Sequence, residues 1–213
     1  MATAREIHRH MKSVGNIGKI TKAMKMVAAA RLRRAQERAA ASRPYAIKIK
    51  EVLSNVVSDP SILANLSAKE HPLLQHREVK KVGYLVLASD KGLAGAYSSN
   101  ALKMAVAEIA ACEDEVVVIT CGRKARDFFQ RRGYNVLESH FGFSDRPAYD
   151  NAVEVAQDAA KRFAAEGFDE LRIVYTIFKS ALSQTPTCEK ILPVEPPAKE
   201  AGKAEASFMF EPG

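Results

Sequence analysis

The chain has 213 residues, enough for one or two domains, and its 47% hydrophobic and 27% charged residues exclude a disordered chain. No run of 18 or more apolar residues occurs, so the sequence contains no candidate for a membrane-spanning helix. The net charge of +7 is uneven, because residues 1–58 carry thirteen Lys and Arg against three acidic residues, a net +10 that indicates an acidic partner, while the remainder sums to −3.

The first residues give little sign of a targeting segment. They lack the apolar core of a secretory signal. They are Arg-rich and poor in acidic residues, as a mitochondrial presequence is, but the helical pattern continues past any cleavage region. The three cysteines, Cys112, Cys121 and Cys188, lie in or beside apolar runs without C-x-x-C spacing. They are predicted to be buried free thiols in a reducing compartment.

One long helix is predicted from residue 4 to about residue 57. Strong helix formers dominate this stretch, which contains only Gly15, Gly18 and Pro44 as breakers. Its apolar residues lie mostly three or four positions apart and form the narrow stripe of a coiled-coil seam: Ile7, Met11, Val14, Ile17, Met24, Val27, Tyr45, Ile49, Val52 and Val56. The helix would be roughly 80 Å long, far longer than a compact domain of the remaining residues. Because such a stripe is not stable alone in water, we expect another element alongside it.

Strands and helices alternate in the rest of the chain. After a turn-prone stretch at 58–75, we expect strands at 82–88, 116–121, 134–137, 171–178 and 188–194, and helices at 97–111, 123–131 and 150–165, the last with Asp150 as its N-cap. This alternation is typical of an α/β fold with a mainly parallel, Rossmann-like sheet. Residues 195–203, rich in Pro, Ala, Lys and Glu, are expected to form a loose surface segment.

Two glycine-containing segments invite comparison with phosphate-binding loops. The pair Gly18-Lys19 has Ser13 and Ile20 where a P-loop requires glycine and Ser/Thr, and it lies within the predicted helix. The loop 89–95 lies between a strand and a helix, where α/β folds bind phosphates, but Gly92 and Gly95 lack the third glycine of a dinucleotide motif. We favour a tight structural turn formed by Asp90, Gly92 and Gly95, in which Asp90 caps local amides.

No residue is predicted to be catalytic, to bind a cofactor or to ligate a metal. Nucleophile-elbow and zinc motifs are absent, and the five histidines are scattered among polar residues, which favours solvated imidazoles. Nucleic acid is an alternative acidic partner for the basic helix. Against it, the charges of this helix cover several faces, and no aromatic residue precedes Tyr45. These points make a nucleic-acid-binding arm the second choice, and a small nucleotide-using enzyme is the third.

Three segments resemble the signatures of one family. Residues 13–35, which include the run Lys19-Ile-Thr-Lys-Ala-Met-Lys-Met-Val27, look like the N-terminal helix of gamma subunits of F-type rotary ATP synthases, and residues 42–46 continue the match. Residues 89–95 and 178–193 resemble the second and third signatures. The resemblance covers essentially the whole chain and is specific.

The resemblance implies a non-catalytic rotor subunit. Gamma subunits form a shaft inside a ring of alpha and beta subunits, and proton flow through the membrane sector turns the shaft to drive catalysis on the ring. By similarity, the segment that meets the ring includes Lys19, Lys22, Met24, Lys25, Arg33 and Arg34. The α/β domain would dock on the epsilon subunit and the membrane c-ring. This implies a peripheral location on the cytoplasmic face of a bacterial plasma membrane, or alternatively on the matrix side of an organelle membrane, with no nucleic-acid partner and no cofactor.

The expected organisation departs from the family in one respect. We expect a helix at 1–58, a linker at 59–78, an α/β domain at 79–194 and a loop at 195–213. Gamma subunits end with a second long helix antiparallel to the first, and this sequence stops about where that helix would begin. The resemblance therefore implies a truncated sequence, or one from which part of the polymer is absent, and the missing helix is the partner that the seam requires.

Overall fold

The computed structural model describes residues 3–58 and 71–194, except for the side chains of 54–58. It consists of two compact units, Met1–Asn55 and Val56–Gly213, and each is described by itself. We call them the helical unit and the α/β unit. The predictions for 59–70 and 195–213, which include most of the linker and the loop towards a second helix, lie outside the described residues.

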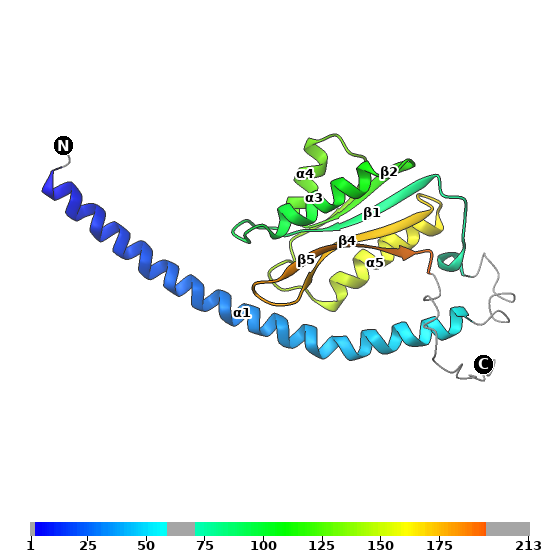
Figure 1. Ribbon diagram of the computed structural model, residues 1–213, viewed down its shortest axis with the longest axis horizontal. Helices are drawn as coiled ribbons and strands as arrows, with labels where there is room; N and C mark the ends of the chain where they lie inside the picture. The colour runs from blue at the N-terminus through cyan, green and yellow to red at the C-terminus, as the bar shows by residue number, and fades with distance from the viewer. Residues whose placement is uncertain (1–2, 59–70, 195–213) are drawn as a thin grey trace. The chain divides into compact units, whose positions relative to one another are not determined.

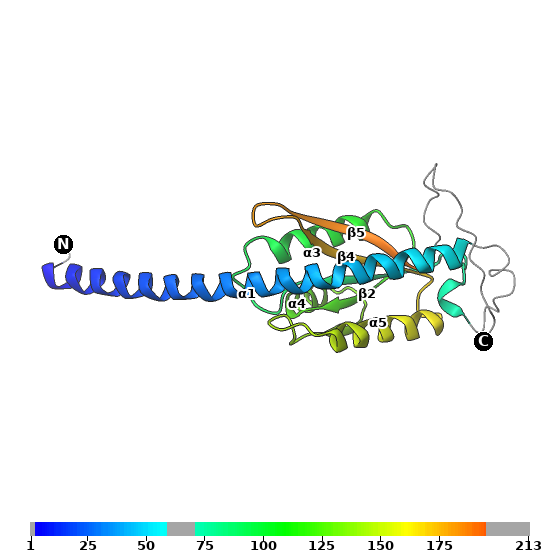
Figure 2. The ribbon, with the colours of Figure 1, turned by 90° about the horizontal axis from the view of Figure 1, so that it is seen from below.

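The helical unit contains all but the last three residues of α1, Ala4–Ser58, a single helix of 55 residues. At its start, the Glu6 carboxylate accepts a hydrogen bond of 2.8 Å from the backbone amide of Thr3, which satisfies a donor that the first turn would otherwise leave unpaired. The helix continues through Gly15, Gly18 and Pro44. Figure 1 shows α1 as one gently curved helix, and Figure 2 shows it unbroken from another side. The predicted long helix is therefore confirmed.

The α/β unit contains a five-stranded sheet in the order β3-β2-β1-β4-β5. The strands are β1 Lys81–Leu87, β2 Glu115–Cys121, β3 Val136–His140, β4 Glu170–Phe178 and β5 Gln184–Leu192. The first four are mutually parallel, with Tyr84 of β1 opposite Val118 of β2 and Arg172 of β4. β5 pairs antiparallel with β4 because the connection 179–183 is too short for a crossover. The expected mainly parallel α/β fold is confirmed.

Helices cover both faces of this sheet. On one face lie α3, Tyr97–Ala110, and α4, Arg123–Arg131, while α5, Tyr149–Ala164, lies on the other (Figure 1). Side chains alternate along β1, so Tyr84 belongs to the core beneath α3 and α4, and Leu85 to the core with Phe163 of α5. A short 3-10 helix, η1 Pro72–Leu74, precedes β1. Because β1, β2, β3 and β4 are parallel, their carboxyl ends lie at the same edge of the sheet, which we call the carboxyl edge.

Several boundaries differ from the sequence-based expectation. β3 begins two residues later than predicted, and β5 begins at Gln184 instead of 188, because its exposed and partly polar residues pair with the end of β4. Asp150 is not the N-cap of α5, since the helix begins at Tyr149 and Asp150 lies in its first turn. Instead, the Asn151 side chain accepts a hydrogen bond of 3.0 Å from the Ala148 amide.

The cysteines also differ in part from the prediction. All three are free, as expected, but each is only half-buried. Burial raises the pKa of the Cys121 and Cys188 thiols to about 11. A raised pKa keeps these thiols protonated and weakly nucleophilic at neutral pH.

Candidate functional site

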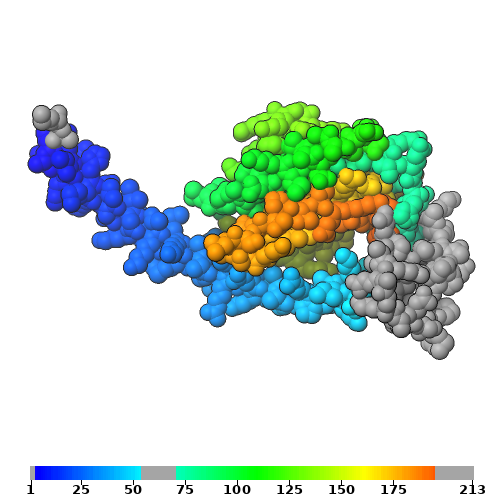
Figure 3. All heavy atoms as spheres, in the orientation of Figure 1, coloured from blue at the N-terminus to red at the C-terminus, as the bar shows by residue number. Residues whose placement is uncertain are grey.

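The apolar side of α1 is exposed along the first half of the helix. Ile7, Met11 and Val14 are more than half exposed, with Met11 at 68%, and together with His10 and Gly15 they line a shallow hollow of about 630 Å³. Further along, the same holds for Ile17, Ile20 and Met24. In Figure 3 the blue N-terminal part of α1 is a single helix whose side chains project outwards. An exposed apolar stripe of this length is typical of a surface that packs against another element.

The predicted contact lysines lie on a different side of α1. Lys19, Lys22 and Lys25 are three residues apart and exposed, so they form a row along one face of the helix. Lys22 is two positions from both Ile20 and Met24, which places it about 200° from them around the helix axis. Helix geometry therefore groups the lysines and separates Met24 from them. No carboxylate among the residues described by the structure forms an ion pair with any of the three lysines.

The two predicted contact arginines differ from each other. The Arg33 Nε donates to the Glu37 Oε1 at 2.9 Å, one helical turn later, and both side chains are largely exposed. Such a pair contributes only a few tenths of a kcal/mol, about 0.3–0.5, to helix stability. Arg34 is exposed on the adjacent side. Sequence reasoning did not include Glu37, although its spacing of four residues from Arg33 was a detectable signal.

A second cluster of polar contacts lies at the carboxyl edge of the sheet and centres on Asp90. Its carboxylate accepts three backbone hydrogen bonds, from the amides of Arg123 at 3.0 Å, Gly142 at 2.9 Å and Ser144 at 3.1 Å. The Asp90 amide in turn donates to the Ser144 Oγ at 3.1 Å. A nearby ion pair between Lys91 and Asp145 joins the same two loops. We call this arrangement the Asp90 cluster.

The Asp90 cluster corrects one prediction. Asp90 was expected to cap local amides, but its donors are 33 to 54 residues away in the sequence. Burial of the carboxyl opposes ionisation, yet hydrogen bonds from Ser144, Arg123 and Gly142 outweigh it and hold the pKa of Asp90 below its ordinary value. The carboxylate therefore fastens the loop after β1 to the start of α4 and to the loop after β3.

The glycines of this edge have unequal roles. Gly95 has φ +57°, a conformation that residues with a side chain rarely adopt. Gly92 does not have such a φ, and a Cβ there would meet no atom within 4 Å. The position with the strongest requirement is Gly122, which precedes α4. It has φ +103°, and a Cβ there would lie 2.2 Å from the Ala88 carbonyl oxygen. Sequence reasoning missed Gly122, although a glycine between a strand and a helix was a usable signal.

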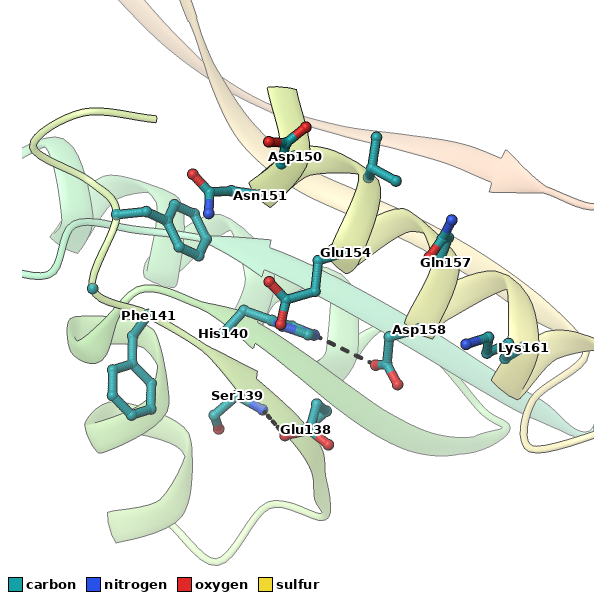
Figure 4. A pocket seen from close by; sticks show the side chains of 13 residues that line it. Glu138, Ser139, His140, Phe141, Asp150, Asn151, Glu154, Gln157, Asp158 and Lys161 are labelled. Carbon is teal, nitrogen blue, oxygen red and sulfur yellow. Dashed lines mark hydrogen bonds and ion pairs between the residues drawn. The ribbon is translucent and has the colours of Figure 1, made fainter. Parts of the chain in front are cut away.

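A hollow of about 870 Å³ lies between the end of β3 and α5. Figure 4 shows His140 reaching from β3 towards Asp158 of α5, and the His140 Nε2 lies 3.4 Å from Asp158 Oδ2. Arg162 joins this contact, donating to Asp158 and to Glu138 at 2.9 Å each. The prediction of a solvated imidazole is therefore wrong for His140. Its side chain is only 10% exposed, because strand alternation directs it towards α5.

These features do not form a recognisable chemical centre within the described part of the chain. No group of three or more His, Cys, Asp or Glu side chains in residues 3–58 and 71–194 could hold a metal ion. Over the same residues, no helix combines the length and the apolar character needed to cross a membrane. The prominent features are therefore the exposed surface of α1 and the tied loops of the carboxyl edge.

Comparison with known proteins identifies the family. A family model described as ATP synthase matches residues 3–213. The ATP synthase gamma chain of Desulforamulus reducens is 41% identical over 212 residues, which cover 100% of this chain and 72% of that protein. The gamma chain of Brevibacillus brevis is 44% identical over 211 residues, covering 98% of this chain and 71% of the relative.

Solved structures agree on the fold. The central stalk and c-ring structure of the Tetrahymena thermophila mitochondrial ATP synthase matches with a TM-score of 0.60 at 24% identity, over 82% of this chain and 72% of that chain. The rotor of the Euglena gracilis mitochondrial enzyme matches with a TM-score of 0.59 at 14% identity, over 88% of this chain and 62% of that one. Sequence relatives and fold agree, and the chain belongs to the gamma chain family of ATP synthases.

Proposed function

We propose that the chain is the central-stalk rotor subunit of an F-type ATP synthase. It would couple proton flow through the membrane sector to ATP synthesis or hydrolysis at alpha–beta catalytic sites by rotation. The observation that carries this proposal is α1, a helix of 55 residues whose apolar side chains are exposed along its first half. A helix of this length can transmit torque only if its apolar stripe is packed, as it would be inside a ring of subunits together with a second helix.

The charge of α1 supports an acidic surrounding. Lys19, Lys22 and Lys25 form an exposed row without ion-pair partners among the residues described. Charge complementarity would guide this row into an acidic collar and fix its orientation more than it would strengthen binding. Under this proposal, Met24 packs on the apolar side of the helix, and Arg33 and Arg34 extend the contact. The ring contacts would thus be divided between two faces of α1.

The α/β unit would form the base of the rotor. We propose that it docks on the epsilon subunit and the membrane c-ring, at the cytoplasmic face of a bacterial plasma membrane. Catalysis would belong to the alpha–beta ring, and this chain would need no cofactor of its own. The tied loops of the carboxyl edge support a mechanical role, because bonds between three loops resist deformation under load.

Co-expression with alpha and beta subunits tests the proposal most directly. We expect a tagged full chain to recover an alpha–beta hexamer with one copy of this chain, and the purified chain alone to show no ATP turnover. Binding of duplex DNA at about 0.15 M salt with micromolar affinity, without recovery of the hexamer, would instead support the nucleic-acid alternative.

Neutralising the lysine row should weaken coupling. In a reconstituted complex, K19Q, K22Q and K25Q together should lower proton pumping severalfold relative to the rate of ATP hydrolysis, because the charged contacts that orient the shaft are lost. Pumping is measured by quenching of a pH-sensitive dye in vesicles. A control triple variant, K103Q, K161Q and K179Q, removes the same charge from exposed positions of the α/β unit and should leave the ratio unchanged. Equal ratios in both variants would remove the three lysines from the proposed contact.

A further inference from the structure

Helix α4 concentrates positive charge within an otherwise acidic surface. Residues 71–194 contain sixteen Lys and Arg and sixteen Asp and Glu. Five of these cations, Arg123, Lys124, Arg126, Arg131 and Arg132, fall within residues 123–132, against Asp127 as the one acidic residue of that stretch. Residues 123–132 therefore carry +4, and the rest of residues 71–194 carries −4. We call these five cations, with Phe128 and Phe141, the α4 patch.

Most cations of the α4 patch are available to a partner. Arg126 is held by Asp127, with its Nε and a terminal nitrogen 2.9 and 2.8 Å from the same carboxylate oxygen. The hydrogen bond from Arg126 and the charges of Arg126, Arg131 and Lys124 hold the pKa of Asp127 below its ordinary value. Asp127 is therefore ionised at neutral pH and balances the charge of Arg126. The other four cations are exposed and form no ion pair with any carboxylate that the structure describes. Arg123 and Arg131 lie eight residues apart, about two helical turns, on one face.

Two phenylalanines orient the guanidinium groups of this patch. Arg123 and Arg126 lie 5.4 and 4.6 Å from the ring centroid of Phe141, and Arg132 lies 3.7 Å from that of Phe128. Phe141 is 43% exposed, and it leaves the end of β3 in a different direction from His140 (Figure 4). Stacking restricts an arginine while leaving its N–H edge free for bidentate hydrogen bonds. Arginines next to exposed aromatic rings are typical of protein interfaces.

We propose that the α4 patch binds an acidic segment of another protein, with carboxylates spaced about two helical turns apart. The nine-residue helix α4 is only about 14 Å long and, with Arg132 directly after it, offers four cations without an ion pair, fewer than the 6–10 phosphate contacts of a strong nucleic-acid binder. A dense phosphate surface, of lipid or nucleic acid, would also place phosphates against Asp127. A peptide can place its carboxylates on Arg123 and Arg131 and avoid that position. The inference does not depend on the proposed function, because it uses no residue of α1.

The test is a titration of the ¹⁵N-labelled full chain, followed residue by residue by NMR. The probe is a short helical peptide with two glutamates eight residues apart and neutral residues between them, compared with the same peptide carrying glutamines. We expect the glutamate peptide to shift the amides of 123–132 and of Phe141. The variant R123Q, K124Q and R131Q should weaken this binding about tenfold, since three exposed charged contacts are lost. The control triple variant defined above should bind like the unmodified chain, and the spectrum of each variant shows whether it is folded.

Three outcomes would overturn the inference. In the first, the amide shifts occur only within residues 4–58, so that the acidic peptide recognises α1 alone. In the second, both triple variants lose affinity equally, which indicates a general charge effect. In the third, α4 responds more strongly to duplex DNA, or to phosphatidylcholine vesicles containing phosphatidylglycerol, than to the peptide. The shifts of α1 and α4 are read separately, so failure here would leave the proposed role of α1 untouched.

Discussion

Replacing Gly122 with alanine should destabilise the α/β unit by about 4 kcal/mol or prevent it from folding, because two penalties combine at this position. The backbone has φ +103° and ψ 141°, a region that only glycine adopts readily. In addition, the new Cβ would lie 2.2 Å from the Ala88 carbonyl oxygen, so the end of β1 or the start of α4 would have to move. Urea unfolding, followed by near-UV circular dichroism of tyrosines such as the buried Tyr84, measures the loss.

Gly133 provides the matched control. It also has a positive φ, +74°, but a Cβ there would meet no atom within 4 Å. G133A should therefore cost only the conformational penalty, about 1–2 kcal/mol. The difference between the variants reports the contact with Ala88 together with the stricter backbone conformation at Gly122. If G122A and G133A unfold at the same urea concentration, the close approach at Gly122 has no energetic consequence.

Replacing Asp90 with asparagine should cost about 2–3 kcal/mol at neutral pH. The carboxylate accepts three amide hydrogen bonds, and hydrogen bonds to charged groups contribute roughly 1.5–3 kcal/mol each, without being additive. The lower range is appropriate because Asp90 is only half-buried. An asparagine would also turn an N–H₂ group towards backbone donors. Loosening of the carboxyl edge should appear as faster hydrogen exchange at the amides of Arg123, Gly142 and Ser144.

The stability difference between the unmodified chain and D90N should depend on pH. Because the pKa of Asp90 is lowered in the folded chain, its contribution is fully present above the ordinary value of 3.8 and is lost as the pH falls through the lower folded value. The stability gap between the unmodified chain and D90N should be constant near neutral pH and shrink in acid. D114N, which alters an exposed carboxylate, should stay within about 0.5 kcal/mol of the unmodified chain. A gap that widens on acidification would contradict the assigned hydrogen bonds.

The tied carboxyl edge connects these two predictions. Gly122 allows the start of α4 to approach the end of β1, and this approach brings the Arg123 amide to Asp90. The same arrangement sets the angle at which α4 presents Arg123 and Arg126 to Phe141. Loss of Gly122 or Asp90 should therefore also disturb the α4 patch, which is why the binding test changes only outward-facing cations.

The sequence predicted the features that depend on local patterns. The apolar and cationic spacing of α1, the alternation of strands and helices, and the run from Arg123 to Arg131 all follow from periodicity and helix propensity, and the structure has them. Boundaries were less accurate where the pattern was polar, as in β5, whose residues are placed by pairing with β4. Pairing with a neighbouring strand can extend a strand beyond its apolar residues.

Only the tertiary structure decided which distant residues meet. Local reasoning gave Asp90 nearby amides, but its partners lie 33 to 54 residues away, because parallel strands bring three loops to one edge. His140 meets Asp158 for a different tertiary reason, since strand alternation turns it towards α5, which packs on that face of the sheet, although its sequence neighbours are polar. Periodicity describes which side of an element is apolar, whereas the partners of a polar side chain depend on where the loops converge. The sequence thus determined the long helix and the α/β pattern, and the packing of the sheet determined the Asp90 cluster and the α4 patch.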